Sequence, residues 1–380
     1  MLSTRTITAD QLTPEEIQAW EQMVRRNPAL CSPFFLPQFA LAVGRVNSDV
    51  RIVVAESDGR PVAFFPFQRA ETGEPAAIGE SLNDFQGIIS CPEKNIPAGD
   101  VLKSAGIQRL FCAKLLDWQD DFQRNVIVRN PAPYVDLTDG YAAWEISMQK
   151  KGSSQLKQVG RKERKLIREC GPIRFEFRTD SQEVLTRLIE WKRDQYRRTN
   201  ERDALAPGWP MILLHDLLRT PVDSKLQPAL SAMYAGDHLV AAHYGLTSDH
   251  VYHWWFPTYN PEFGGYSPGK ILLRRLLFEA PKHGITRFDF GVGHEDYKFT
   301  FANKSVDVSR AIVDNNAARR WLRTQWYHTR IALKGTPIGP GLRRLRRQLR
   351  QLTTTAASCM PRRPRQNFLA VSPGDSRKLQ

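Results

Sequence analysis

The sequence predicts a mixed α/β fold in which helices pack on a mixed sheet. Helical and extended patterns alternate along the chain, which is typical of such layered folds. Apolar runs flank Asp58-Gly59 and again Gly236-Asp237, and each arrangement predicts a β-hairpin. The segment 56–63 aligns with 234–241, about one domain length further on, and this indicates two similar halves. Because any two hairpins share such a pattern, a coincidence stays open as the alternative.

Length and charge indicate how the chain is divided. Its 380 residues suffice for two domains of about 150–190 residues each. Residues 315–380 contain 15 basic residues and 1 acidic residue, whereas residues 1–314 contain 39 of each, so the last part carries the whole net charge of +14. We expect an N-terminal half over 1–140, a second half over 141–314 and a basic, partly helical to disordered tail over 315–380. A neutral body with a basic tail argues against a DNA-binding fold.

The first half is expected to begin with a helix within residues 1–30. Thr13-Pro14 supplies a helix cap and a first-turn proline, and Glu15 and Glu16 place acids in the first turn. Strands are then expected at 51–55 and 61–67, on the two sides of the first hairpin turn.

The second half is expected to begin with a basic helix over 142–167, which ends before Gly171-Pro172. The elements expected after it are a strand at 174–178, helices at 181–198 and 211–218, strands at 228–235, 238–246 and 250–256, a helix at 267–280 and a strand at 286–292.

The tail has a different pattern. A basic helix is expected over 319–334, a break over 335–341, and then a basic amphipathic stretch over 342–352. Such a stretch suits an anionic membrane surface, but a solvated helix or a disordered end is the simpler interpretation. Disorder is expected from residue 353 onward.

The loop before the helix at 267–280 is a candidate phosphate-binding site. Glycines allow a ligand to approach the backbone, and the positive end of a helix favours anions. The spacing matches neither the dinucleotide fingerprint nor the P-loop, so an ordinary loop and helix cap is the alternative. The candidate residues are Gly264, Gly265, Tyr266, Ser267, Gly269 and Lys270.

Several segments, taken together in order and spacing, resemble the acyl-CoA N-acyltransferase (GNAT) superfamily. More narrowly, they resemble the CelD-like acetyltransferases of cellulose and polysaccharide biosynthesis, which are relatives of the FemABX aminoacyl transferases. The segments that carry the resemblance are Arg161-Lys162-Glu163-Arg164-Lys165-Leu166, Trp191, Gly236-Asp237-His238-Leu239-Val240-Ala241, Tyr266-Ser267-Pro268-Gly269, Arg287-Phe288-Asp289-Phe290-Gly291 and Tyr297-Lys298-Phe299-Thr300-Phe301. In the first half, 31–35 and 63–67 resemble the family's degenerate N-terminal copy. The resemblance covers about residues 30–310 and implies a tandem GNAT-like fold.

The resemblance implies acetyl-CoA or another acyl-CoA as donor, with its pyrophosphate on the loop before Ser267. The usual GNAT loop carries an Arg or Gln and a G-x-G-like run, which this loop lacks. FemABX relatives use aminoacyl-tRNA, so that donor stays open as an alternative.

Acyl transfer requires a base for the acceptor proton and donors for the developing oxyanion. The resemblance implies that Lys298 stabilises this charge, because Tyr297-Lys298-x-x-Phe301 resembles a FemABX Phe-Lys-x-x-Phe segment. Asp289 and His243 are the candidates for the base or for the group that orients it. The alternatives are a solvent-facing lysine, a structural acid and a core histidine.

The acceptor-binding candidates are Trp191, His253, Trp255 and Arg161, since aromatic rings stack on sugars and a basic helix attracts anions. Sheet core and a solvated charged face are the alternatives. The five cysteines form no C-x-x-C pair, and no metal-ligand motif is present, so neither a metal nor a disulfide framework is expected. No apolar run is long enough to span a membrane, and no signal-peptide pattern is seen, so we expect a cytoplasmic protein, peripheral to the inner membrane face if the tail binds there.

These observations favour an acyltransferase that moves an acyl group to an amino sugar or another small-molecule, nucleotide-linked or lipid-linked envelope precursor. A FemABX-like aminoacyl-tRNA-dependent transferase is one alternative. A non-catalytic binding or scaffold protein with a degenerate CoA site is the other.

Overall fold

The computed structural model describes residues 2–69, 73–93, 96–116, 126–151, 154–293, 295–314 and 316–334. The described part of the chain divides into a compact unit over residues 1–322 and a second unit that begins at residue 323. The amphipathic stretch expected at 342–352 and the disorder expected from 353 lie outside the described residues. No helix within the described ranges is long and apolar enough to cross a bilayer.

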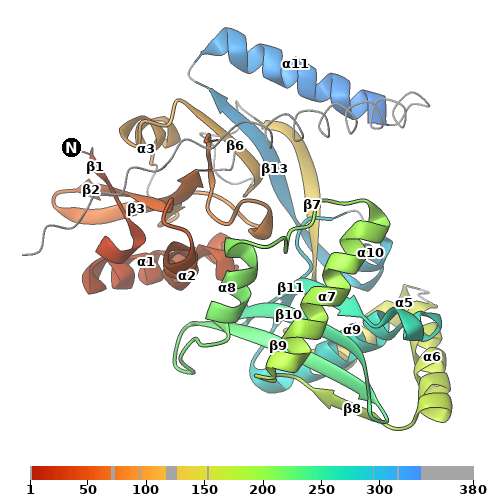
Figure 1. Cartoon of the computed structure of the whole chain (residues 1–380). Helices are drawn as coiled ribbons and strands as arrows, with labels where there is room; N and C mark the ends of the chain where they lie inside the picture. Colours follow the sequence, from red (N-terminus) through yellow and green to blue (C-terminus); the bar gives the residue numbers. More distant parts are fainter. Residues whose placement is uncertain are drawn as a thin grey trace, which may run out of the picture. The chain divides into compact units, whose positions relative to one another are not determined.

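One mixed sheet of thirteen strands runs through the first unit, in the order β1-β2-β3-β4-β6-β13-β7-β12-β11-β10-β9-β8, with β5 paired to β3 (Figure 1). The strands of the first half are Leu2–Ile7 (β1), Arg51–Ser57 (β2), Arg60–Arg69 (β3), Pro75–Ala77 (β4), Ile89–Ser90 (β5), Arg109–Leu116 (β6) and Val126–Asp136 (β7). Those of the second half are Ile173–Glu176 (β8), Leu226–Ala235 (β9), His238–Ser248 (β10), Val251–Tyr259 (β11), Arg287–Asp289 (β12) and Lys304–Asp314 (β13). The predicted mixed α/β fold is confirmed.

The two halves repeat one strand pattern. From one edge, β1 to β4 pair antiparallel and β4 then pairs parallel with β6. From the other edge, β8 to β11 pair antiparallel and β11 then pairs parallel with β12. The repeat indicated by the hairpins is therefore visible in the sense and order of the strands.

The halves share the middle of the sheet. The last strand, β13, lies between β6 and β7, and β7 pairs on its other side with β12. Each half thus places one strand beside the other half, and the sheet has no break near residue 140. Backbone hydrogen bonds across these pairs hold the halves in one unit.

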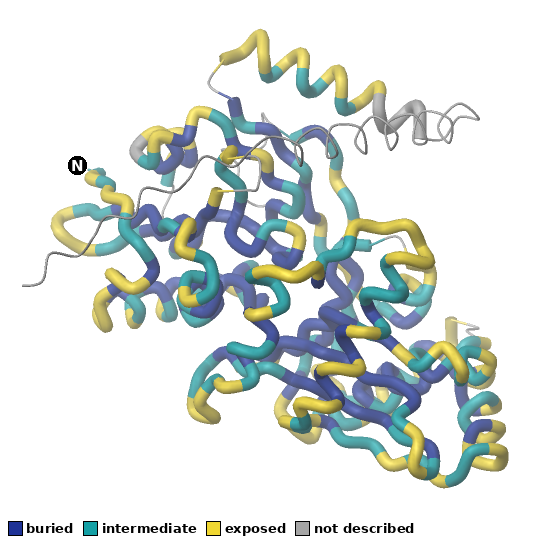
Figure 2. The backbone as a smooth tube through the Cα atoms, in the orientation of Figure 1, coloured by how far each residue is buried: buried dark blue, intermediate teal, exposed yellow. Residues whose placement is uncertain are grey.

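Helices cover the sheet. They are Pro14–Arg26 (α1), Pro37–Val46 (α2), Ala98–Ser104 (α3), Gly140–Lys150 (α5), Gln155–Cys170 (α6), Gln182–Thr199 (α7), Trp209–Leu217 (α8), Pro268–Glu279 (α9), Asp296–Phe301 (α10) and Ala317–Lys334 (α11). The expected start at Thr13 is confirmed, because its hydroxyl accepts the Glu16 N–H and the Glu16 carboxylate accepts the Thr13 N–H. In Figure 2 the strands are mostly buried and the outer faces of the helices are exposed.

Two expectations were wrong in detail. The single helix expected over 142–167 is two helices, α5 and α6, and the sequence between them is the poor helix former Gly-Ser-Ser. The strand expected over 286–292 ends at Asp289, and Gly291 then adopts a left-handed φ of 64° that no strand continues through.

Candidate functional site

The sheet opens between two neighbouring strands, β11 and β12. These strands pair in parallel over only three positions, from Val251–Arg287 to His253–Asp289. Strand β11 continues to Tyr259, whereas the chain leaves β12 and turns at Gly291. On the side of β12, the part of β11 beyond His253 therefore has no strand beside it among the described residues. Side chains from elsewhere in the chain can lie there, while β10 remains paired on the other side.

Two glycines leave room for those side chains. A Cβ atom at Gly291 would overlap the Asp84 carboxylate, and a Cβ atom at Gly293 would meet Glu295 and Lys298. Close approach of polar groups to this segment thus requires glycine at both positions.

Asp84 reaches the opening from the first half. Its carboxylate lies 3.0 Å from His253 Nε2 and forms an ion pair with Lys114. Burial alone would raise the pKa of Asp84, but Lys114, His253 and Lys298 together hold it well below its usual range. An ionised carboxylate accepts, so His253 Nε2–H donates to it. His253 Nδ1 is buried and finds no hydrogen-bond partner among the described residues.

Two buried lysines lie near the cluster formed by Asp84, His253 and Lys114. Lys298 Nζ, on α10, is 3.2 Å from Glu295 Oε2. Lys192 Nζ, on α7, donates to the carbonyl of Pro257 on β11 at 3.1 Å and to Gln195 Oε1 at 3.3 Å. The pKa of Lys192 is lowered to about 8, chiefly by burial, with Glu295 opposing the shift and Lys298 adding to it. A lysine tuned in this way can hold or release a proton near neutral pH.

Two tyrosines border the lysines. The Tyr297 hydroxyl, on α10, accepts the Trp254 indole N–H at 3.0 Å, and burial raises the pKa of Tyr297. Burial, followed by Glu201, Asp203, Asp84 and Glu295, raises the pKa of Tyr196 on α7. Both phenols are therefore neutral hydrogen-bonding groups and not bases.

The candidate phosphate loop forms a second polar surface. Residues 261–266 form a short 3-10 helix, Ser267 follows with a left-handed φ of 56°, and no side chain caps the first turn of α9. Lys162 Nζ on α6 donates to Ser267 Oγ at 2.7 Å, and Lys165 lies over the Tyr266 ring at 5.4 Å. The positive end of a helix beside lysines favours an anion.

The three loop glycines leave this surface uncrowded. Added Cβ atoms at Gly264 and Gly269 would only touch the Tyr259 ring at 3.6 Å, and nothing lies within 4 Å of one at Gly265. Lys270 Nζ, in the same turn, donates to Gln155 Oε1 at 3.1 Å. The loop predicted from the sequence is thus half-exposed and flanked by basic side chains.

The two candidate histidines, His243 on β10 and His253 on β11, lie in different environments. His243 is fully buried: its Nε2 accepts the Trp255 backbone N–H at 3.0 Å, and its Nδ1 therefore donates to the Tyr252 hydroxyl, also at 3.0 Å. Burial lowers the pKa of His243 well below its usual range. Both ring nitrogens are occupied, so the structure places His243 in the core and only His253 beside the opening.

Asp289 lies on β12 next to His253 in register, yet it faces a different partner. Its Oδ1 accepts from Arg287 Nε at 2.9 Å, and its Oδ2 is buried without a partner among the described residues. Asp289 is therefore a member of an internal ion pair with Arg287.

The remaining candidates are dispersed. Trp255 donates its indole N–H to the Leu82 carbonyl at 2.7 Å and so links the two halves. Trp191 is half-buried against the core between the halves, and Arg161 is exposed on α6. Three of the predicted site residues lie at the strand opening: Tyr297, Lys298 and His253. Three others make hydrogen bonds that support the structure around it: His243, Asp289 and Trp255.

Sequence reasoning missed four groups that lie around Lys298 and His253: Asp84, Lys114, Lys192 and Tyr196. Lys192 and Tyr196 stand four residues apart on a helix that was predicted, so their shared face was a usable signal. Asp84 had none, because its partner His253 is 169 residues away.

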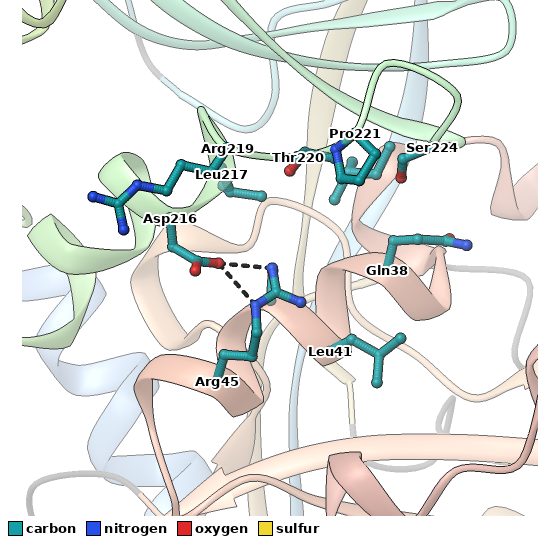
Figure 3. A pocket seen from close by; sticks show the side chains of 11 residues that line it. Gln38, Leu41, Arg45, Asp216, Leu217, Arg219, Thr220, Pro221 and Ser224 are labelled. Atoms are coloured by element: carbon teal, nitrogen blue, oxygen red, sulfur yellow. Dashed lines mark hydrogen bonds and ion pairs between the residues drawn. The ribbon is translucent and has the colours of Figure 1, made fainter.

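Two cavities lie where residues of the two halves meet. One, of about 380 Å³, is lined by 80–82 and 202–210. The Ser81 carbonyl in its wall accepts from Lys114, and the Leu82 carbonyl accepts from Trp255, so the cavity borders the cluster. The other, of about 230 Å³, lies between α2 and the end of α8, where Arg45 binds Asp216 (Figure 3). Within the described ranges, no group of His, Cys, Asp or Glu is arranged to hold a metal ion.

Comparison with known proteins places this geometry in context. Residues 153–299 match the family model described as an acetyltransferase (GNAT) domain. This segment of the chain is therefore similar to a GNAT acetyltransferase domain. It contains the strand opening, the loop before α9, Lys192 and Lys298. A search of curated proteins found no match.

Solved structures share the fold of both halves. FemX matches with a TM-score of 0.56 at 10% identity, over 84% of this chain and 100% of that chain. The C-terminal domain of a putative lysylphosphatidylglycerol synthetase from Agrobacterium fabrum matches with a TM-score of 0.53 at 13% identity, over 82% and 94%. At such identities the likeness is one of fold, and it covers both halves of the GNAT-containing unit.

Proposed function

We propose that this protein is an acyltransferase that takes an acyl group, most simply acetyl, from acyl-CoA and moves it to an amine of an amino sugar or a related cell-envelope precursor. The observation that carries the proposal is the pair of buried lysines, Lys192 and Lys298, at the strand opening inside the matched GNAT domain. The narrower CelD-like assignment and a cytoplasmic location, where acyl-CoA is available, belong to this proposal.

The loop before α9 suits the donor. In the first turn of α9, Pro268 has no N–H and the Lys270 N–H donates to the Ser267 carbonyl at 3.0 Å, so Gly269 is the residue whose N–H can meet a ligand. Lys162 and Lys165 lie beside this turn. A pyrophosphate would be held by the Gly269 N–H, the positive end of the helix and the two lysines, while Gly265 and Gly269 leave space for it. Bound acyl-CoA supplies a thioester carbonyl activated toward attack.

The cluster suits the transfer step. Attack of the acceptor nitrogen forms a C–N bond and breaks the C–S bond of the thioester. Lys298 stabilises the negative charge that develops on the carbonyl oxygen. Lys192, whose pKa of about 8 leaves part of it neutral, accepts the proton from the acceptor nitrogen and can return it to the departing sulfur.

The cavity of about 380 Å³ suits the acceptor. Its wall carries the Trp209 ring, which offers an apolar face to a sugar, and three charged side chains, Glu80, Arg202 and Asp203, the last of which is paired with Arg193. Glu80 has a left-handed φ of 45°, an uncommon conformation for this residue that often marks functional sites. A nucleotide-linked or lipid-linked amino sugar is the acceptor class that these groups favour.

A transfer assay tests the proposal. Purified full-length protein would be given labelled acetyl-CoA and a panel of free and nucleotide-linked amino sugars, and N-acetylated product would be separated and counted. Lys298→Ala is expected to lower kcat by about 10²–10³-fold, because it removes one oxyanion-stabilising group. Lys103→Ala, which changes an exposed lysine, is the matched control and should leave kcat unchanged.

The same assay separates the rival functions. Transfer from aminoacyl-tRNA but not from any acyl-CoA would replace the donor. Absence of transfer from both donors to every acceptor, with Lys298→Ala indistinguishable from the parent, would favour a binding or scaffold protein.

A further inference from the structure

Helix α11 presents an apolar face to solvent. Trp321, Leu322 and Trp326 are 62%, 59% and 56% exposed, which is unusual for three large apolar side chains within six residues. With 3.6 residues per turn, the three fall within one side of the helix, together with the exposed Gln325 and Thr329. Figure 2 shows the described part of this helix mostly exposed.

The start of this helix is firmly fixed. Asn316 caps it by accepting the Arg319 N–H at 3.0 Å, and Asp314, at the end of β13, accepts the Asn316 N–H at 2.8 Å. Arg319 also forms an ion pair with Asp314 at 3.5 Å, and Arg320 donates to the Asp314 carbonyl at 3.1 Å. The apolar face is therefore held on a formed helix from its first turn.

The charge around this face has one sign. The helix contains no acidic residue, and no acid occurs between Asp314 and Asp375. Residues 315–380 contain 15 basic residues and 1 acidic residue. The surface that complements this segment must therefore be anionic and must also accept large apolar side chains.

An anionic lipid surface meets both requirements. Trp side chains prefer the boundary between headgroups and acyl chains, and basic side chains bind anionic headgroups. A nucleic acid would satisfy the charge and could stack on the tryptophans, but it gives no reason for Leu322 on the same face.

We propose that α11 docks this protein on anionic membranes, with Trp321, Leu322 and Trp326 inserted at the headgroup boundary and the net positive charge of 315–380 attracting the chain to the anionic lipids. This proposal does not depend on the acyltransferase activity. It gives the enzyme, or a scaffold, the same location.

Co-sedimentation with lipid vesicles tests the proposal. Full-length protein is expected to bind phosphatidylcholine vesicles that contain about 30% phosphatidylglycerol, and to bind pure phosphatidylcholine at least about tenfold more weakly. The double variant Trp321→Ser/Trp326→Ser is expected to lose at least about tenfold in affinity for the anionic vesicles. Ile212→Ser, which changes a residue of similar exposure (53%) on α8, is the matched control and should bind within about twofold of the parent.

Two results would overturn the proposal. One is equal binding of the double variant and the parent to anionic vesicles, which would show that the charge of the tail acts without the helix face. The other is failure of the parent to bind anionic vesicles, including the case in which it binds an RNA oligomer instead. Thermal unfolding of each variant would verify that it is folded.

Discussion

Gly291 is the position where a single methyl group should disrupt the candidate site. Replacement by Ala forces an L-residue into a φ of 64°, which costs about 1 kcal/mol. The new Cβ would also overlap the Asp84 carboxylate. If Asp84 moves away, it loses charged hydrogen bonds to His253 and Lys114, each contributing about 1.5–3 kcal/mol in a buried setting. We therefore expect Gly291→Ala to lower the free energy of unfolding by about 4 kcal/mol.

Gly59 supplies the matched control. It sits in the β2–β3 turn at a φ of 73°, and an added Cβ there would meet nothing within 4 Å. Gly59→Ala should therefore cost only the backbone strain of about 1 kcal/mol. Urea unfolding of the parent and both variants at pH 7 measures the two losses. A loss for Gly291→Ala no larger than that for Gly59→Ala would refute the crowding of Asp84 against this segment.

Three further substitutions separate charge, packing and catalysis. Asp84→Asn should lower the unfolding free energy by about 3 kcal/mol at pH 7. Because the folded-state pKa of Asp84 is depressed, the carboxylate stabilises the protein fully above its unfolded pKa of about 3.9, and this stabilisation is lost as the pH falls below that value. The urea midpoints of parent and variant should therefore converge as the pH falls below about 4. His243→Leu should cost about 2–4 kcal/mol, because it leaves the Trp255 N–H without its acceptor and leaves the Tyr252 hydroxyl with Ser231 alone, but kcat per folded molecule should stay within about twofold; a large fall in kcat would instead make His243 catalytic. In the parent, kcat/KM should rise with pH through about 8; Lys192→Met should lose this rise and about 10²-fold or more in rate without losing stability, because burial already disfavours the Lys192 charge below pH 8, and an unchanged profile would exclude Lys192 as the base.

The fold could be predicted where local chemistry decides it. Asp58-Gly59 and Gly236-Asp237 each turn a hairpin, since Asp58, Gly59 and Gly236 adopt the left-handed conformations that such turns need. Ser267-Pro268 marked the start of α9 because Pro fits the first helical position. The position of β13 between β6 and β7 could not be predicted from the local sequence, because packing of the whole sheet determines which strands pair when they are far apart in sequence.

The candidate site could be predicted only in part for the same reason. The resemblance of 297–301 to a known segment singled out Lys298, and the glycines singled out the loop before α9. Lys298 lies on α10, and this helix is too short to show helical periodicity in the sequence. Asp84 joins the site by a contact across the two halves. The sequence also could not show which of the two histidines, His243 or His253, would be enclosed by the core.

Titration of acetyl-CoA into the full-length protein by calorimetry tests the central claim most directly. In about 0.3 M salt, which suppresses weak binding of CoA to the basic tail, we expect one saturable site of micromolar Kd. Gly269→Trp should fill the space over the first turn of α9 and weaken binding by at least about tenfold, while Gly99→Trp, at an open position far from that helix in sequence, should not. Absence of saturable binding, or binding that Gly269→Trp leaves unchanged, would contradict an acyl-CoA site at this loop.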